Sequence, residues 1–417
     1  MTAPRRDSRY YLLFFCLLVI GAGNSMLFAV APPMMRQLGL PDSSIGWVFA
    51  LSALLWVFAS PFWGRLSDRI GRKPIVAMGL AAYAVSMGGF GAVIVLGTFG
   101  ILSGVGLFVG LMLTRAIFGV FGSAASPAAQ AYVADHTSPF ERTERLAALT
   151  AAFALGQAFG PAICAALAAR VGLVFPILLV AALAAAAAFA TWRFLPEAKP
   201  ARGDRTQADD WRQSLALARD PRLSAYLIYG FALSLVTGTS VQVFALFTMD
   251  RLGVAGEAGA ELAAAGFMVG ALALLATQMA VLPRLRLGAR TLMALGTGLI
   301  AAGVAIQISA PSLGALMVSQ AVQGLGFGLA RPGYTGGASV SVRHDEQGAA
   351  AGLVVAMNGA GFIFSPVVGG LAYERLGMNA PLLLSLVLLA GMLAFTLLSR
   401  RLRTQTYITP PTDVSTP

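Results

Sequence analysis

The chain is poor in charged residues and in the side chains from which catalytic and metal sites are built. Asp, Glu, Lys and Arg make up 11% of its 417 residues, against about 25% in an average soluble protein. The histidines are His136 and His344, and neither is accompanied by a nucleophile or a cluster of metal ligands. No phosphate-binding loop of the form G-x4-G-K-[ST] is present. These absences argue against an enzyme, a metal- or cofactor-binding protein and an ATP-driven pump.

Cysteine is equally scarce. Cys16 and Cys164 each stand in an apolar run, without a CxxC pattern or a histidine nearby. We therefore interpret both as small apolar side chains and not as a disulfide or as metal ligands.

What the chain has in abundance is apolar sequence, with 57% of its residues hydrophobic. Runs of about 20 apolar residues are long enough to cross a bilayer as helices. The runs predict an all-α polytopic membrane protein with spans near 11–34, 45–63, 75–96, 104–134, 143–168, 174–194, 224–249, 260–282, 291–310, 312–341, 348–373 and 380–399. Because residues 11–34 can span the bilayer and lack a cleavage signature, we expect a first helix there and not a removed signal peptide.

Arginine and lysine predict the orientation of these spans. Of the 29 Arg and Lys residues, 23 fall in segments that twelve spans place on the same side as both termini. The opposite side has only Arg36, Arg170, Arg251 and Arg375. Cytoplasmic loops carry the excess of positive charge, so both termini are expected in the cytoplasm, at the inner membrane of a bacterium. The net charge is +11, but the cations are distributed over many loops and are not gathered in one binding patch. This distribution argues against nucleic-acid binding.

The two halves of the sequence are related by a constant offset of about 205 residues. This offset aligns Gly119 with Gly324, Pro127 with Pro332, Glu141 with Glu346, Pro161 with Pro366 and Arg170 with Arg375. A duplicated six-helix unit with a central polar linker follows from this pattern. The expected division is a first bundle, a cytoplasmic linker, a second bundle and a disordered tail, at 1–195, 196–222, 223–403 and 404–417.

One charged segment stands between the second and third apolar runs. It reads Gly64-Arg65-Leu66-Ser67-Asp68-Arg69-Ile70-Gly71-Arg72-Lys73-Pro74. Its cations predict a short cytoplasmic turn, in which Gly71 allows a chain reversal and Pro74 starts the next helix. The segment resembles the loop between helices 2 and 3 of the major facilitator superfamily, G-x-L-x-D-R-x-G-R-[KR]. The resemblance covers essentially the whole chain and is nearest the twelve-helix drug/proton antiporters, which include tetracycline-type exporters.

This resemblance implies a cytoplasmic gate. Asp68 would contact the N-terminal end of helix 11 and a basic partner from helix 4 or its loop, with Asp135, Arg142 and Arg145 in the same network. The alternative is an exposed local salt bridge of Asp68 with Arg69 or Arg72, which would contribute little. We favour a latch that opens in the other state. The matching loop of the second half has Leu285 where Asp68 stands, which suggests a role that this half does not share.

Two arginines lie inside predicted spans. Arg115 and Gly119 match the R-x-x-x-G pattern of helix 4 in the family. A lone arginine in lipid faces a cavity or a partner, so Arg115 either hydrogen-bonds structurally or acts on protons or a substrate anion, and both roles stay open. Arg331 precedes Pro332, a candidate kink and hinge in the tenth span. It either extends to the membrane surface or forms an anion site with Arg115.

Two further segments resemble the family's antiporter motif, G-x3-G-P-x2-G-G. The first contains Gly156, Gly160 and Pro161 but ends in Cys164 and Ala165. Its repeat partner contains Gly361 and Pro366 and keeps the final pair, Gly369 and Gly370. Glycine and proline in these positions permit close helix packing and a bend. In the family this motif is associated with exporters.

No Asp or Glu lies in the middle of any of the twelve runs. Proton coupling would then have to use Asp135, Asp250 or a group on the substrate, unless the protein is a uniporter. Taken singly, a polar residue in a span is more often a contact between helices than part of a site. The candidates for a central cavity are Asn24, Arg115, Gln242, Arg331, Tyr334 and Asn358.

The leading hypothesis is a monomeric secondary transporter that exports a small organic molecule, in exchange for protons, by alternating access. Within transport, the alternative is uptake or exchange of a small organic anion, which Arg115 and Arg331 would favour. The alternative from another class is a non-transporting membrane sensor with the same fold. We expect no cofactor and no metal. The expected partners are the substrate, protons and the lipid bilayer.

Overall fold

A computed structural model describes residues 8–137, 139–197, 216–284, 287–343, 346–399 and 402. These segments contain twelve helical stretches that are long and apolar enough to cross a membrane, as the apolar runs predict. The first six comprise α1 (Ser8–Gln37), α2 (Ser43–Ile70), α3 (Arg72–Thr98), α4 (Gly104–Val120) with η1 (Gly122–Ala124) and α5 (Ala125–Asp135), α6 (Pro139–Val171) and α7 (Val174–Phe194). The last six comprise α9 (Pro221–Leu252), α10 (Gly256–Ala276) with η2 (Thr277–Val281) and η3 (Leu282–Arg284), α11 (Ala289–Ser309), α12 (Leu313–Val340), α13 (Gln347–Leu376) and α14 (Ala380–Leu398).

Each half of the chain forms a bundle with its own buried core. In the first bundle α1 packs against α6 and α3 packs against α7; in the second, α9 packs against α13 and α11 packs against α12. The bundles meet mainly where α2 contacts α13 and α6 contacts α10. Two six-helix repeats therefore build the molecule, in agreement with the offset of 205 residues.

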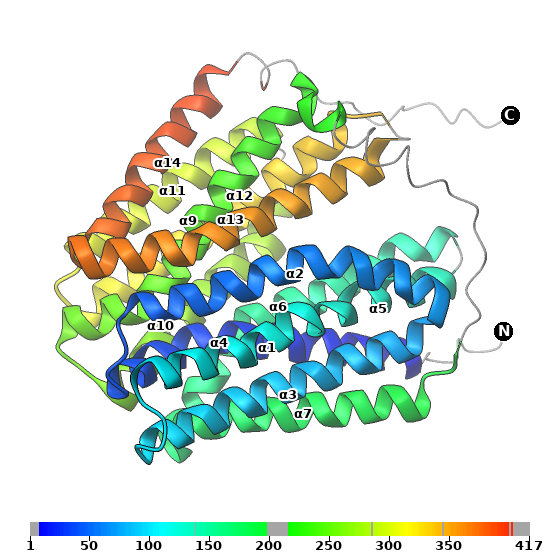
Figure 1. Ribbon diagram of the computed structural model, residues 1–417. Helices are drawn as coiled ribbons and strands as arrows, with labels where there is room; N and C mark the ends of the chain where they lie inside the picture. The colour runs from blue at the N-terminus through cyan, green and yellow to red at the C-terminus, as the bar shows by residue number, and fades with distance from the viewer. Residues whose placement is uncertain are drawn as a thin grey trace, which may run out of the picture.

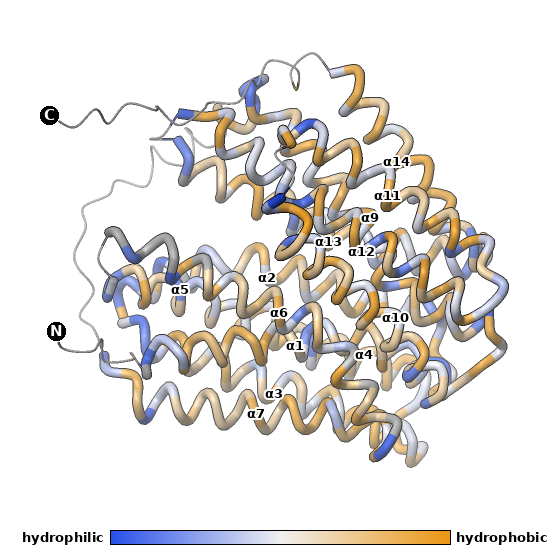
Figure 2. Tube along the Cα trace, turned by 180° about the vertical axis from the view of Figure 1, so that it is seen from behind, coloured by the Kyte–Doolittle hydropathy of each residue, from blue (hydrophilic) through white to orange (hydrophobic). Residues whose placement is uncertain are grey.

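The arrangement of the bundles gives the molecule two distinct ends. Figure 1 places the start of α1 and the end of α14 at one end, which we call the terminal end, and the turns between α1 and α2 and between α9 and α10 at the other, the far end. The helices of the two bundles converge at the far end and diverge towards the terminal end. In Figure 2 hydrophobic residues cover the middle of the helices, while hydrophilic residues gather near the ends, as expected of a protein embedded in a bilayer.

The structure differs from the sequence prediction at the connection between α2 and α3. Residues 65–70 are helical and form the end of α2, whereas the sequence predicted a loop there. The next helix, α3, begins at Arg72, two residues before Pro74. Gly71 alone separates the two helices, with φ +113°, a conformation that favours glycine. Polar residues beyond the bilayer can continue a helix because water and side chains satisfy its end.

The expected division at 196–222 and 404–417 falls largely on residues outside the described ones. The described part of the linker includes Asp220, whose carboxylate accepts a hydrogen bond from the backbone N–H of Arg222 and so caps α9 at its start. The exact boundaries of the domains stay a prediction.

Candidate functional site

Arg115 is buried near the middle of the first bundle. It lies on α4, is 1% exposed, and its Nη2 donates to Oδ1 of Asn24 on α1 at 2.7 Å. Its guanidinium carbon lies 4.6 Å from the ring centre of Phe118 and 5.4 Å from that of Phe49. Nε and Nη1 have no hydrogen-bond partner among the described residues. Because an unpaired buried donor is costly, the N–H groups of these two nitrogens can bind an anion or a carbonyl oxygen strongly.

A second polar group joins three helices of the other bundle. Oδ1 of Asn358 on α13 accepts hydrogen bonds from the hydroxyl of Tyr334 on α12, at 2.6 Å, and from that of Ser234 on α9, at 2.9 Å. Tyr334 is 1% exposed. The structure thus brings together two of the residues predicted for a cavity, in an arrangement that also holds α9, α12 and α13 together.

Gln242 is the third polar feature of the spans. It lies on α9, is fully buried, and neither atom of its amide has a hydrogen-bond partner among the described residues. The adjacent Val241 packs against the small apolar cluster that joins Ala29 of the first bundle to Phe244 of the second. An unsatisfied amide at this junction is a candidate for contact with a bound molecule or water.

Arg331 is exposed on α12, nine residues before this helix ends at Val340. Its guanidinium has no hydrogen bond or ion pair within the part of the chain that the structure describes. The proposed pairing of Arg331 with Arg115 around an anion stays a prediction. Pro332 lies inside α12, which continues to Val340.

At the terminal end of the first bundle, Arg72 joins α2, α3 and α5. Its guanidinium lies 2.5 Å from Asp68 and 3.0 Å from Asp135, and its Nη1 donates to the hydroxyl of Ser67 at 2.6 Å. Asp68 is half-exposed, with 51% of its side chain accessible. The cluster lies within one bundle, so the contact of Asp68 with the N-terminal end of helix 11, here α13, stays a prediction for another state.

The remaining gate candidates are spread around this cluster. Gly64 and Arg69 lie on α2, and Lys73 lies on α3 with its ammonium 5.5 Å from the ring centre of Trp192. Arg145 on α6 is 3.5 Å from Glu141 and lies over the ring of Tyr10. Arg142 belongs to α6, but its side chain lies outside the described residues.

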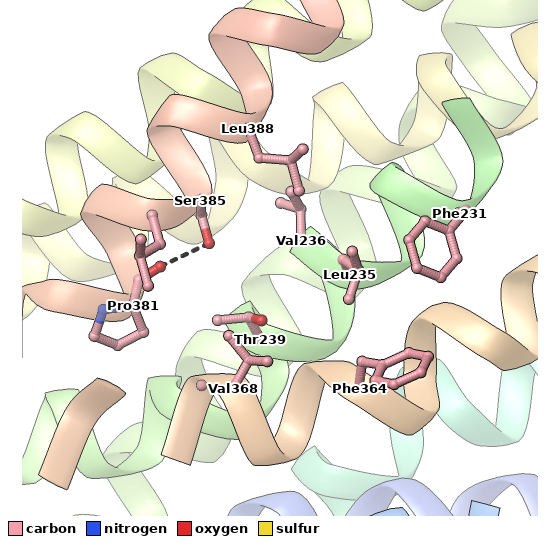
Figure 3. Close-up of a pocket in the computed structure, with 11 residues that line it drawn as sticks. Phe231, Leu235, Val236, Thr239, Phe364, Val368, Pro381, Ser385 and Leu388 are labelled. Atoms are coloured by element: carbon pink, nitrogen blue, oxygen red, sulfur yellow. Dashed lines mark hydrogen bonds between the residues drawn. The ribbon is translucent and has the colours of Figure 1, made fainter. Parts of the chain in front are cut away.

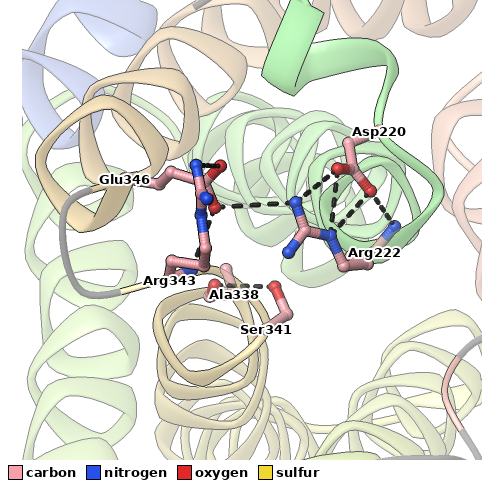
Figure 4. Close-up of polar contacts among 6 residues, drawn as sticks. All are labelled: Asp220, Arg222, Ala338, Ser341, Arg343 and Glu346. Atoms are coloured by element: carbon pink, nitrogen blue, oxygen red, sulfur yellow. Dashed lines mark hydrogen bonds and ion pairs between the residues drawn. The ribbon is translucent and has the colours of Figure 1, made fainter.

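The second bundle has an ion-pair cluster of its own at the terminal end, which Figure 4 shows. Arg222 lies 2.7 Å from Asp220 and 3.5 Å from Glu346, and Glu346 also lies 3.1 Å from Arg343. Asp220 also accepts hydrogen bonds from the guanidinium and from the backbone N–H of Arg222, and these bonds lower the pKa of Asp220. The cluster connects the start of α9 to the turn before α13, where Asp68 is predicted to bind.

The far end carries an ion pair and a hydrogen bond that cross between the bundles. Arg36, at the end of α1, contacts Asp42 of its own bundle at 2.7 Å and Asp250 of α9 at 2.5 Å. The hydroxyl of Tyr373 on α13 also donates to Asp250. The backbone N–H of Ser43 donates to Glu374 of the other bundle at 2.9 Å. Arg36 and Ser43 thus connect the first bundle to the second at the far end.

The glycines of the antiporter-like motifs lie where helices pack closely. A Cβ on Gly156 would overlap the carbonyl of Leu18, and one on Gly160 the carbonyl of Ala22, both on α1. A Cβ on Gly361 would lie 2.5 Å from Cβ of Ser234 on α9. The neighbouring prolines, Pro161 and Pro366, lie inside α6 and α13. The predicted role of these glycines in close packing is consistent with this geometry.

Comparisons with known proteins identify the family. The family model described as Major Facilitator Superfamily matches residues 13–286 and 280–415. The chain belongs to this superfamily. It is 27% identical to Multidrug resistance protein 1 of Bacillus subtilis (strain 168), over 93% of this chain and 95% of that protein, and 28% identical to Multidrug resistance protein 2 of the same organism, over 92% and 93%.

Solved structures agree on the fold of this superfamily member. A bacterial homologue of the human lysosomal transporter Spinster, in an inward-facing and unoccupied conformation, has a TM-score of 0.72 at 15% identity and covers 97% of this chain and 98% of its own. The fold and the family make the chain a transporter of small molecules across a membrane, and not an enzyme. Of the alternatives from sequence, the family favours transport over a sensor.

An apolar cavity of about 370 Å³ in the second bundle of this transporter is a poor candidate for the transport site. Figure 3 shows it between α9, α13 and α14. The hydroxyl of Ser385 donates to the carbonyl of Pro381 at 2.8 Å, and that of Thr239 to the carbonyl of Ser365 at 3.5 Å. Both hydroxyl groups that line the cavity therefore already donate to backbone carbonyls. Alternating access requires a site that both bundles share, which this one-bundle cavity does not provide.

Sequence reasoning missed the far-end contacts and the cluster around Arg222. Arg36 was visible as one of only four cations expected on its side of the membrane, and that rarity was a usable signal. The partners Asp250 and Tyr373 follow it by more than 200 residues, so that only the packing of α1 against α9 could have revealed them.

Proposed function

We propose that this transporter exports lipophilic organic molecules from the cytoplasm in exchange for protons, by alternating access, with its terminal end facing the cytoplasm. The observation that carries the proposal is the similarity to two multidrug resistance proteins along nearly the whole chain. The excess of Arg and Lys in the segments of the terminal end supports the orientation. A bacterial inner membrane and a monomer are parts of the same proposal.

The far-end contacts fit a gate that opens and closes. The side chains of Arg36 and Asp250 are 26% and 36% exposed, and such pairs contribute about 0.2–1 kcal/mol each. A few contacts of this size favour the closed far end without preventing its opening. When the bundles rock, Arg36 would keep Asp42 but lose Asp250, while Asp68 would move towards the start of α13.

The sign of the charges limits which carboxylate can carry the coupled proton. A proton taken up from outside, after the substrate has left, has to favour closure of the far end. Protonation of Asp250 removes its charge and weakens its attraction to Arg36, so it favours an open far end. Asp250 therefore acts in the gate, and Asp135 is the remaining carboxylate candidate for coupling, because a proton on the substrate would leave the cell with it.

Arg115 suggests a second candidate function, the transport of small organic anions. Its Nε and Nη1, which have no partner among the described residues, could donate to a carboxylate or a phosphate. A buried guanidinium could equally bind a carbonyl oxygen of a neutral drug. Arg115 therefore does not favour anion transport over export of neutral drugs.

The test is flux through the purified protein in liposomes with an imposed pH gradient. Cationic, neutral and anionic compounds are compared, and an ionophore that collapses the gradient is the control. Export predicts gradient-dependent movement of lipophilic cations or neutral drugs. Movement of organic anions alone would replace export by the anion function.

A further inference from the structure

A cavity at the far end lies in the seam between the two bundles. Its volume is about 270 Å³. Most of its wall belongs to the first bundle, from the ends of α1 and α3 and the turn between α6 and α7, and one residue, Glu257 of α10, belongs to the second. Across the seam, Oε1 of Glu257 lies 3.7 Å from the Cβ position of Gly172, and Nε2 of Gln37 lies 2.7 Å from that of Gly256.

The cavity has an apolar floor and a polar rim. Met34, Ile94 and Leu173 line it and are at most 6% exposed. Gln37, Thr98 and Glu257 line it and are exposed. An apolar body can thus be buried while a polar head stays at the surface.

Glu257 gives the rim a negative charge. Among the residues that the structure describes, no hydrogen bond or ion pair engages its carboxylate. The arginines of the far end do not neutralise it among the described residues: Arg36 is held by Asp42 and Asp250, Arg251 donates to the carbonyl of Ile308, and no ion pair joins Glu257 to Arg170. The free carboxylate is available to an ammonium group.

We propose that this cavity binds a small amphiphilic organic cation from the far side of the membrane. The ligand has one aromatic or alkyl group on the floor and one ammonium group beside Glu257. A volume slightly below the usual range of drug pockets, about 300–1,000 Å³, selects a single ring or a short chain. The site is separate from Arg115 and does not depend on what the protein exports.

The position of the site gives it a regulatory effect. Floor and carboxylate belong to different bundles, so opening of the far end separates them. A ligand that contacts both binds the closed far end more tightly and shifts the protein towards it. The cation therefore slows turnover from outside. This effect rests on the alternating-access part of the proposed function, whereas binding itself does not.

Binding is tested by calorimetry on the full-length protein in lipid nanodiscs, with benzyltrimethylammonium as the probe. Glu257→Gln is expected to weaken binding about fivefold, the effect of one partly exposed ion pair. Glu261→Gln, one turn further along α10 and also exposed, is the matched control and leaves binding unchanged. The anion 3-phenylpropionate, which has a similar apolar body, is expected not to bind. Equal binding to Glu257→Gln, or equal binding of the anion, overturns the site.

The effect on the gate has a separate readout. Spin labels at Phe99→Cys and Leu376→Cys, both exposed at the far end of opposite bundles, report the distance between the bundles. Benzyltrimethylammonium is expected to enrich the short-distance population, and Glu257→Gln to reduce this response. An unchanged distribution at saturating probe overturns the regulatory effect, whatever the outcome of drug-flux measurements.

Discussion

Arg36 connects the two bundles by contacting Asp250 at 2.5 Å while it remains bound to Asp42 of its own bundle at 2.7 Å. The arginine therefore has a partner in either state of the far end. If the far end opens as proposed, Arg36 loses one carboxylate and keeps the other, so its charge stays paired. Among the described residues, Asp250 would then keep the hydroxyl of Tyr373.

The first prediction concerns Asp250→Asn. The neutral amide loses most of its attraction to Arg36, so the open far end gains up to about 1 kcal/mol, or about fivefold in population. Labelling of a cysteine placed at Gln242, which is buried beside the junction, measures this opening. Glu261→Gln removes a carboxylate from the same end and is the control. Unchanged labelling in Asp250→Asn would show that the ion pair does not gate the far end.

The second prediction concerns Asp68→Asn. If Asp68 latches the terminal end shut in the other state, its loss slows turnover, by about tenfold, and leaves substrate affinity nearly intact. Initial rates and equilibrium binding of the same drug measure the two quantities. Arg65→Gln, a neighbouring change on α2, is expected to have little effect. A large loss of affinity with normal turnover would contradict the latch.

The third prediction separates the two arginines of the spans. Arg331 is exposed and Arg115 is buried. If Arg331 binds an anion, Arg331→Ala abolishes transport of acids and spares neutral and cationic compounds. Parallel flux measurements with the three classes decide this. Equal loss for all three would make Arg331 a structural residue.

The fourth prediction concerns Gly156→Ala. Its Cβ would overlap the carbonyl of Leu18, so α1 and α6 have to separate, at a cost of about 1–3 kcal/mol. Thermal unfolding in detergent is expected to occur at a lower temperature. The control is Gly352→Ala on α13, where a Cβ meets nothing within 4 Å and alanine favours the helix. An equal effect of both changes would exclude close packing as the cause.

The sequence predicts the helices well because hydrophobic length is a local property. Twelve runs, the internal repeat and the family follow from spacing and motif alone. The end of α2 was predicted less well, since Arg65–Ile70 are polar enough to suggest a turn but remain helical beyond the apolar run.

The sequence predicted which residues belong to the candidate site but not which of them contact each other. Asn24 and Arg115 were both candidates, as were Tyr334 and Asn358, but their pairing depends on how helices pack. Arg36 with Asp250, and Arg222 with Glu346, join residues more than 100 positions apart. A single sequence carries no local pattern for such contacts.

In the proposed function, drug movement and proton movement are coupled. The most direct test of this coupling is the internal pH of liposomes that contain the protein, followed with an entrapped dye when a lipophilic cationic drug is added to one side. We predict proton movement opposite to the drug, saturable in drug and about tenfold slower in Asp68→Asn. Drug movement without any change of internal pH would contradict proton-coupled export.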